Sequence, residues 1–330
     1  MRPSRPRPEL PTLAAVVREQ TELSWGKARD LCRSGRVFVD GEVADDPALR
    51  VAAERVEVRP DAPRRRSGLL PAEALVHVDR LVAVVNKPPG VLSVRYHDDD
   101  RDTLADQLRA RLRRVARQEA RRQGRRYDPP VGVVHRLDKG TSGLLVFSRT
   151  VQAKKHLASQ LREHSMRRTY VALVHGKARP GRHDTILVPN RGDGIRGTHG
   201  RFRPASGKPP REARRAITHV VASLPLDGAS LVACRLETGR QHQIRIHLAE
   251  AGHPLVGETV YVRDHRRAGR REIEAPRPML HACELGFVHP MSDEPVRFEV
   301  PPPADFLEAL AALGGAPVDW RRAAFGTARA

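Results

Sequence analysis

Residues 133–147 read VVHRLDKGTSGLLVF, a polar block that holds a carboxylate, two cations and small residues between two apolar segments. Short runs rich in Val and Leu predict β-strands, and the polar block between them predicts a loop at the edge of a sheet. Loops on a rigid scaffold often carry binding and catalytic groups. Asp138, in the middle of this loop, is therefore the first candidate for a catalytic residue.

The whole chain is strongly basic. Its 330 residues include 59 Lys and Arg against 39 Asp and Glu, which gives a formal net charge of +20. Such an excess indicates a polyanionic partner, and arginine suits bidentate contacts to phosphate. Hydrophobic residues make up 39% of the chain, enough for a sizeable core in one large domain with a smaller one beside it.

Several classes of protein are disfavoured by what the sequence does not contain. Cys32, Cys234 and Cys283 form no Cys-x-x-Cys pair, so neither a disulfide framework nor a zinc site is predicted. The basic start, MRPSRPRP, is not followed by the apolar segment of a secretory signal. No apolar run is long enough to span a bilayer. We therefore expect a soluble, cytoplasmic protein without a membrane segment.

Composition and turn signals divide the chain into five segments. We expect a disordered tail over 1–9, a small αβ domain over 10–59, a linker over 60–71, a large domain over 72–311 and a C-terminal tail over 312–330. In the small domain, Ser24 to Gly35 has the cap and stop of a helix. Alternating valines around Asp40 and Gly41 predict a β-hairpin.

The large domain contains both strand-like and helix-like hydrophobic patterns. Apolar, β-favouring runs predict strands over 76–85 (interrupted at Asp79), 169–175, 216–223 and 230–236. Helical spacing predicts helices over 103–126, 151–164 and 241–251, and a long loop is expected over 190–213. The helix over 103–126 carries nine arginines, for which phosphate contact is a better explanation than a solvated face.

Three other functional patterns find no support in the sequence. The histidines at 242, 247, 253, 281 and 289 do not have a convincing metal-ligand spacing. The order His-Arg-Leu-Asp puts one residue too many before the Asp for a kinase catalytic loop, and no Asp-Phe-Gly accompanies it. Ser206-Gly207-Lys208 lacks the upstream glycine of a Walker phosphate loop.

Four sequence blocks, taken in order, resemble the RluA-type family of pseudouridine synthases. The resemblance runs from about residue 76 to residue 300, and a closing block follows at 280–282 and 287–290. Residues 10–59 separately resemble an S4-like RNA-binding domain, through 34–37, 39–41 and 55–58. The four blocks are 84–91 (VVNKPPGV), 135–144 (HRLDKGTSGL), 168–176 (RTYVALVHG) and 237–248 (ETGRQHQIRIHL), the last continuing into 252–257 (GHPLVG).

The resemblance implies an α+β fold in which helices flank a long mixed, mainly antiparallel sheet. It implies an isomerase that converts uridine to pseudouridine in structured RNA. By family analogy, the extra domain favours ribosomal RNA over transfer RNA as the target. No metal or other cofactor is implied, and a monomer is expected. The target base must leave its stack to enter such a site.

The same resemblance assigns roles to individual residues. Asp138 is expected as the catalytic carboxylate, Arg240 as the cation beside it, and Tyr170 as a ring against the uracil whose hydroxyl can take part in proton transfer at C5. Arg136 would fill the space of the flipped base, and His135 would fix the loop by hydrogen bonding. The substrate and RNA contacts are expected from Arg136, His135, Asn86, Lys87, Thr141, His242, Gln243, Arg245 and Leu280.

Two departures from the family pattern are visible. Residues 91–96 (VLSVRY) stand where the family often has a His-Pro pair, and Glu258 stands where it usually has Asp. We expect both to affect how RNA is held rather than catalysis. Two rival hypotheses are an RNA-binding protein that has lost catalysis and a nucleic-acid-binding domain without base selectivity; the presence of Asp138, Tyr170 and Arg240 argues against the first.

Overall fold

The chain forms two compact units. The computed structural model describes residues 10–44, 47, 49–62, 70–97, 100–120, 130–201 and 208–326, with the side chains of 33 and 116–120 left aside. One unit comprises Met1–Gly68 with Arg95–Asp102, and the other Leu69–Val94 with Thr103–Ala330. The expected tail over 1–9 and residues 63–69 of the expected linker lie outside the described residues. Among the described helices, none has the length and apolar character of a membrane span.

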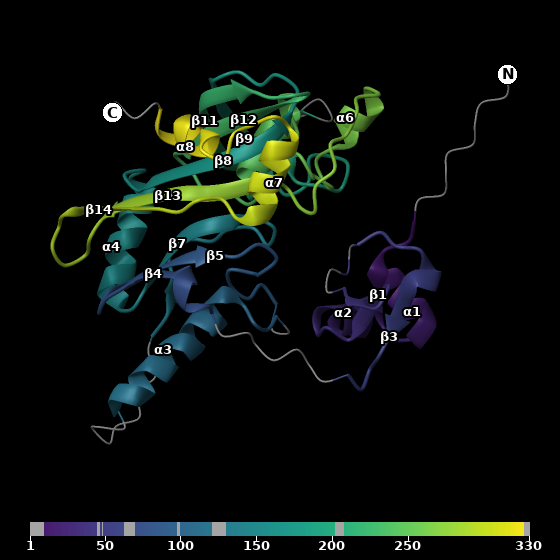
Figure 1. Cartoon of the computed structure of the whole chain (residues 1–330), viewed down its shortest axis with the longest axis horizontal. Coiled ribbons are helices and arrows are strands. Elements are labelled where there is room, and N and C mark those ends of the chain that lie inside the picture. The colour runs from purple at the N-terminus through teal and green to yellow at the C-terminus, as the bar shows by residue number, and fades with distance from the viewer. Residues whose placement is uncertain are drawn as a thin grey trace. The chain divides into compact units, whose positions relative to one another are not determined.

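The N-terminal unit contains two helices and a small antiparallel sheet (Figure 1). Thr12 and Ser24 cap the two helices through their side-chain oxygens, and Leu13, Val17 and Cys32 are fully buried between the helices and the sheet. The predicted helix and hairpin are confirmed, with Asp40 and Gly41 at the turn. The elements are α1 (Leu13–Thr21), α2 (Trp25–Arg33), β1 (Val37–Val39), β2 (Glu42–Val43), the 3-10 helix η1 (Ala53–Arg55) and β3 (Val56–Val58).

The second unit is built on an eleven-stranded sheet. Nine strands follow the order β10-β9-β11-β12-β8-β13-β7-β5-β4, while β14 pairs with β13 and β6 with β7. Among the described pairs, β13 with β7 is parallel and the others are antiparallel, which confirms the predicted fold class. The strands are β4 (Leu75–Val78), β5 (Val82–Lys87), β6 (Gly132–Val133), β7 (Ser142–Ser148), β8 (Arg167–His175), β9 (Gly181–Val188), β10 (Gly197–Thr198), β11 (Arg214–Pro225), β12 (Ala229–Leu236), β13 (Leu280–Val288) and β14 (Pro295–Glu299).

Helices cover both faces of this sheet (Figure 1). Because side chains alternate along a strand, Tyr170 and Ala172 of β8 pack with α3 and α5 on one face, while Val171 and Leu173 pack with α7 and α8 on the other. The predicted helices at 151–164 and 241–251 are confirmed as α4 and α5. The helices are η2 (Ala72–Ala74), α3 (Leu104–Ala120), α4 (Val151–Arg162), α5 (Gln243–Glu250), α6 (Arg263–Arg267), α7 (Ala304–Ala312) and α8 (Asp319–Phe325).

The C-terminal region corrects one expectation. Residues 312–330 were expected to be a tail, but α8 forms within them and buries Trp320, Ala323 and Ala324 against the sheet. The Trp320 ring supplies the apolar area that anchors so short a helix, since isolated helices of this length are not stable in water. Residues 327–330 lie outside the described residues.

Glycine decides how the loop of Asp138 enters the sheet. At the start of β7, Gly143 has φ +113°, and a Cβ placed there would lie 2.2 Å from the carbonyl oxygen of Ala282. Gly143 therefore permits the close parallel pairing of β7 with β13, in which Ser142 lies opposite His281. This pairing explains the small residues that follow Asp138 in the sequence.

Candidate active site

The loop between β6 and β7 that carries Asp138 is held by buried polar contacts. Ser93 Oγ donates to the carbonyl oxygen of Leu137 (2.7 Å) and accepts from its backbone N–H (3.0 Å). His135 Nε2 accepts from the backbone N–H of Val146 (3.2 Å), as expected of a residue that fixes the loop. Desolvation, helped by the charge of Arg168, lowers the pKa of His135 to about 3, so its ring is neutral at pH 7.

Lys87, one of the predicted RNA contacts, has its ammonium group bonded inside the protein. It is fully buried, and its Nζ donates to the carbonyl oxygens of Pro88 (2.9 Å), Val91 (2.8 Å) and Lys139 (3.0 Å). These bonds use the three ammonium hydrogens and tie the 87–91 turn to the Asp138 loop. Burial and the charge of Arg277 lower the pKa of Lys87 to about 7, although Asp138 opposes this shift.

A cavity of about 590 Å³ opens over Asp138 between the loop, α4, β8, β12 and α5. Asp138 is the one acidic side chain among the described residues that line it, against five arginines, so the cavity attracts anions. Asn86 lies in β5 and is not among the residues that line this cavity, so its contact with RNA stays a prediction. The structure brings ten predicted residues together at the lining: His135, Arg136, Asp138, Thr141, Tyr170, Arg240, His242, Gln243, Arg245 and Leu280.

The guanidinium nearest to Asp138 belongs to Arg245, not to Arg240 as predicted. Arg245 Nη1 lies 3.7 Å from Asp138 Oδ2. Arg240 is exposed at the rim, where its Nε donates to the carbonyl oxygen of Arg215 (3.0 Å). The reason is the start of α5: His242 adopts a left-handed conformation with φ 58°, the helix begins at Gln243, and its first turn directs Arg245 inward.

Glu258 fixes this arginine. Its carboxylate accepts from Arg245 Nε (2.8 Å) and Nη2 (2.7 Å), and also from the backbone N–H groups of Val260 (2.9 Å) and Thr259 (3.1 Å). Burial opposes ionisation of Glu258, but Arg245 and these backbone donors outweigh it and lower the pKa of Glu258. The family departure at this position therefore lies against the cation beside Asp138, and its expected effect on how RNA is held stays a prediction.

The other predicted RNA contacts divide into structural and accessible groups. Gln243 is almost fully buried, and its amide bonds to Thr238, to the backbone of Arg240 and to β11, so it shapes the 238–240 turn. Thr141 and Leu280 are also buried, Leu280 as an apolar wall. Arg136 is exposed at the rim and His242 is partly exposed, so these two are the better placed to meet a substrate.

His242 is oriented by a tyrosine that the sequence analysis missed. Its Nδ1 lies 2.7 Å from Tyr261 Oη, and its Nε2 lies 3.9 Å from Asp138 Oδ1. Burial lowers the pKa of His242 although Asp138 opposes this, so the ring is neutral at pH 7. The contact with Tyr261 fixes the orientation of the ring, and Nε2 faces the catalytic loop.

Tyr170 and Arg168 share one face of β8. Tyr170 is buried at the cavity wall, where burial, opposed by the charge of Arg168, raises the pKa of its hydroxyl to about 12. Arg168 Nη2 donates to the carbonyl oxygens of Glu237 (2.9 Å) and Leu236 (3.4 Å). We did not predict Arg168 as a site residue. It precedes Tyr170 by two residues on a predicted strand, so both side chains point to the same face of the sheet, and this spacing could have identified it.

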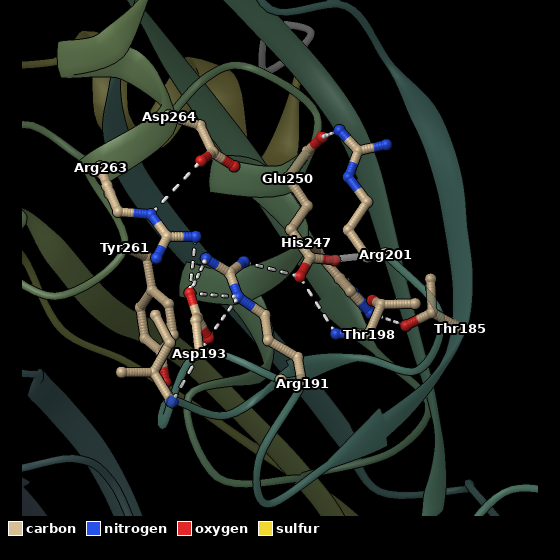
Figure 2. A network of polar contacts seen from close by, with 12 residues as sticks. Thr185, Arg191, Asp193, Thr198, Arg201, His247, Glu250, Tyr261, Arg263 and Asp264 are labelled. Carbon is tan, nitrogen blue, oxygen red and sulfur yellow. Dashed lines mark hydrogen bonds and ion pairs between the residues drawn. The ribbon is translucent and has the colours of Figure 1, made fainter. Parts of the chain in front are cut away.

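Ion pairs hold α5 at both ends. At its C-terminal end, Glu250 accepts from Arg191 Nη1 (3.2 Å) and from the backbone of Thr198 (3.0 Å), as Figure 2 shows. Asp193 joins the same cluster through Arg191 (3.2 Å) and Arg263 (2.6 Å). With Arg245 and Glu258 at the other end, the cluster fixes α5 against the loop between β9 and β11, and so fixes the geometry at Asp138.

Metal binding has little support from this geometry. Within the described parts of the chain, no group of three or more His, Cys, Asp or Glu side chains could hold a metal ion. The arrangement is instead a cation-rich cavity with one carboxylate, an aromatic ring and a neutral imidazole. Such a site suits nucleophilic or electrostatic catalysis on a base that carries a phosphate backbone.

Comparisons with known proteins identify the family of this chain. The RNA pseudouridylate synthase family matches residues 81–250, and the S4 domain matches residues 16–56. The chain is 34% identical to Ribosomal large subunit pseudouridine synthase D of Zymomonas mobilis, covering 86% of this chain and 88% of the relative. It is 33% identical to the protein of the same name from Neisseria meningitidis serogroup A, covering 85% and 72%.

A solved structure shares the fold. Human RNA Pseudouridylate Synthase Domain Containing 4 superposes with a TM-score of 0.52 at 20% identity, and the match covers 73% of this chain and 93% of the human chain. The sheet, the cavity around Asp138 and the sequence matches lead to one assignment. The chain belongs to the RNA pseudouridylate synthase family, a family of isomerases, and carries an S4 domain in its N-terminal unit.

Proposed function

We propose that this RNA pseudouridine synthase modifies ribosomal RNA and that Asp138 is its catalytic carboxylate. The observation that carries the proposal is the position of Asp138 as the one acidic group among the described residues of an arginine-lined cavity. The ribosomal target is supported by the names of the Zymomonas and Neisseria relatives and by the S4 domain. A ribosomal substrate would place the enzyme in the cytoplasm.

The reaction breaks the N1–C1′ bond of uridine, rotates the uracil and joins C5 to C1′, so that C5 loses a proton and N1 gains one. We propose that Asp138 is the covalent or electrostatic partner of the sugar or base in this step. Arg245, at 3.7 Å and fixed by Glu258, supplies an opposite charge in a constant geometry. His242 would donate from Nε2 toward the same carboxylate or the substrate beside it.

Tyr170 would pack its ring against the uracil, with its hydroxyl positioned for proton transfer at C5. Burial keeps this hydroxyl protonated at neutral pH, since the pKa is raised to about 12. Arg136, exposed beside the cavity, would occupy the space that the flipped nucleotide leaves. We also propose a monomer.

A pseudouridine map of ribosomal RNA tests the proposal. The map is made by chemical labelling and primer extension in cells with the gene, without it, and complemented with wild type or Asp138→Asn. We expect a site in large-subunit RNA that vanishes without the gene and returns with wild type only, because loss of the carboxylate should lower turnover by at least about 10³-fold. Binding of the same RNA by Asp138→Asn should be nearly unchanged.

Two results would contradict it. Restoration of the site by Asp138→Asn would remove Asp138 from the chemistry. A site lost from transfer RNA, with ribosomal RNA unchanged, would leave the activity in place and overturn the ribosomal target.

A further inference from the structure

Arg168 is a buried cation in the wall of the catalytic cavity that no carboxylate neutralises. The residue is 6% exposed, and among the described residues no acidic side chain acts on its charge. Its Nε is buried without a hydrogen-bond partner. Burial lowers the pKa of Arg168, yet a guanidinium stays protonated in proteins. Because a charge buried without a partner is costly, this position favours a ligand that brings the missing negative charge.

The other four arginines of the lining have different surroundings. Arg245 is paired with Glu258 through two nitrogens. The remaining three are exposed, so that solvent and salt screen their charges: Arg136, Arg162 and Arg240. Among the described residues of the lining, Arg168 is therefore the guanidinium that is both buried and without an acidic partner.

The Arg168 guanidinium is held in place at the cavity wall. Its Nη2 donates to the carbonyl oxygens of Glu237 (2.9 Å) and Leu236 (3.4 Å). A Cβ at Gly239 would lie 2.7 Å from Nη1, so glycine at this position lets the 238–240 turn lie against the guanidinium without displacing it. Donors that are fixed in advance, in a site with little water, stabilise charge as it develops during a reaction.

The burial of Arg168 favours contact with the base of a nucleotide rather than with its phosphate. A flipped nucleotide inserts its base into the pocket, while its phosphates stay with the RNA strand outside. Tyr170, the residue proposed to pack on the uracil, lies two residues along the same face of β8, about 6.5–7 Å away. Uracil offers the acceptors O2 and O4 to a donor at this position.

The reaction places negative charge on these oxygens. When the N1–C1′ bond breaks, its electron pair leaves with the uracil, which then carries one negative charge spread over N1, O2 and O4. When C5 joins C1′, a pair from the base forms the new bond and the charge disappears. The proton that C5 then loses is balanced by the proton that N1 gains. A fixed cation beside O2 or O4 would stabilise the detached base more than the bound nucleotide.

We propose that Arg168 binds a carbonyl oxygen of the target uracil and stabilises the negative charge of the detached base. This inference rests on the proposed function for its substrate. It gives Arg168 a catalytic role that differs from the role of Arg245, whose charge lies 3.7 Å from Asp138. A carboxylate paired with Arg168 would cancel the charge that the detached base needs, which accounts for the missing counter-ion.

The test combines a substitution in the protein with the change of one atom in the RNA. An rRNA fragment that wild type converts is prepared with uridine, 2-thiouridine or 4-thiouridine at the target position, because sulfur is a weaker acceptor than oxygen. Single-turnover rates and dissociation constants are measured for wild type, Arg168→Gln and the control Arg235→Gln. Arg235 is an exposed cation of the neighbouring strand β12 that is not among the residues lining the cavity. Circular dichroism checks folding, and Arg168→Met replaces Arg168→Gln if the latter does not fold.

On the uridine RNA, we expect Arg168→Gln to react at least about 10²-fold more slowly than wild type with nearly unchanged RNA affinity. Arg235→Gln should match wild type. On one of the two thio RNAs, the rates of wild type and Arg168→Gln should differ by less than about tenfold, because the contact is already weakened there. That RNA identifies O2 or O4 as the oxygen that Arg168 contacts.

Three results would overturn the proposal. A normal rate of Arg168→Gln on the uridine RNA would remove Arg168 from the chemistry. An equal loss on all three RNAs would mean that Arg168 only shapes the 236–240 turn. An equal loss in Arg235→Gln would assign the effect to net charge.

Wild-type conversion of the uridine RNA is measured first, which separates this proposal from the proposed function. If wild type converts a transfer RNA instead, the same series is made in that RNA. Conversion of neither RNA would overturn the assigned reaction together with this role of Arg168. Conversion by wild type and by Arg168→Gln at equal rates would reject the role of Arg168 alone.

Discussion

Helices α5 and α3 both carry arginines in the catalytic unit, but the surroundings of those arginines differ. On α5, Arg245 is buried and bonded through two nitrogens to Glu258, which is itself 4% exposed. On α3, Arg113 and Arg114 are exposed. A buried, bidentate arginine can hold one orientation against a reacting group, whereas an exposed row can follow a flexible polyanion.

The largest expected effect comes from breaking the buried pair. Arg245→Gln would leave the Glu258 carboxylate buried without its cation, which costs about 3–5 kcal/mol of unfolding free energy. It would also remove the charge 3.7 Å from Asp138, and we expect turnover to fall by at least about 10²-fold. Urea denaturation and single-turnover assays measure the two effects.

A matched double variant separates them. Replacing both partners (Arg245→Met with Glu258→Met) should recover much of the stability, since an apolar pair of similar volume avoids the buried unpaired charge. Turnover should stay low. Activity in the double variant close to wild type would show that Arg245 serves the fold and not the chemistry.

Tyr170→Phe should have the next largest effect. The substitution keeps the ring but removes the hydroxyl, and a group that transfers a proton contributes roughly 10²–10⁴-fold to rate. We expect turnover to fall by about 10²-fold with RNA affinity unchanged. Because the pKa of Tyr170 is raised to about 12, wild-type turnover should show no alkaline loss from this group at pH 9. A normal rate in the variant would limit the role of Tyr170 to packing.

Acid should destabilise the catalytic unit through buried histidines. Burial and the charge of Arg277 lower the pKa of His281 to about 4, although its bond to the Val300 carbonyl opposes this. Between pH 6.5 and about 4 the unfolded chain therefore binds a proton that the folded chain does not. As the pH is lowered through this window, the unfolding free energy should decrease by up to about 1.4 kcal/mol per pH unit. In the His281→Asn variant, unfolding should take up one proton fewer, so the pH dependence should be correspondingly weaker. An equal slope in the variant would contradict this.

Much of the fold could be predicted because periodicity and turn chemistry agree with the final packing. The strand interruption at Asp79, the helix over 151–164 and the hairpin at Asp40 all rest on local signals. Helix α8 could not be predicted in the same way, since its seven residues depend on Trp320 finding a pocket on the sheet. Tertiary packing, rather than propensity, stabilises such a helix.

The site was predictable to the level of the loop but not of each side chain. Lys87 was expected as an RNA contact from the family resemblance, and lysine is seldom fully buried, yet three convergent carbonyls hold it inside the protein. The choice between Arg240 and Arg245 depends on where α5 begins, which the left-handed His242 decides. Because successive residues of a helix are about 100° apart, a start shifted by one residue would turn Arg245 away from Asp138.

The smallest expected effect, that of Arg240→Gln, sharpens the comparison between buried and exposed arginines. The Arg240 guanidinium is exposed and bonds to the Arg215 carbonyl, so its loss should change turnover at saturating RNA by no more than about twofold and raise KM a few-fold through one lost phosphate contact. Steady-state kinetics on the rRNA fragment separate the two constants. A fall in turnover as large as that of Arg245→Gln would mean that bound RNA turns the 238–240 segment inward, and that an arginine exposed in the free enzyme becomes part of the catalytic site.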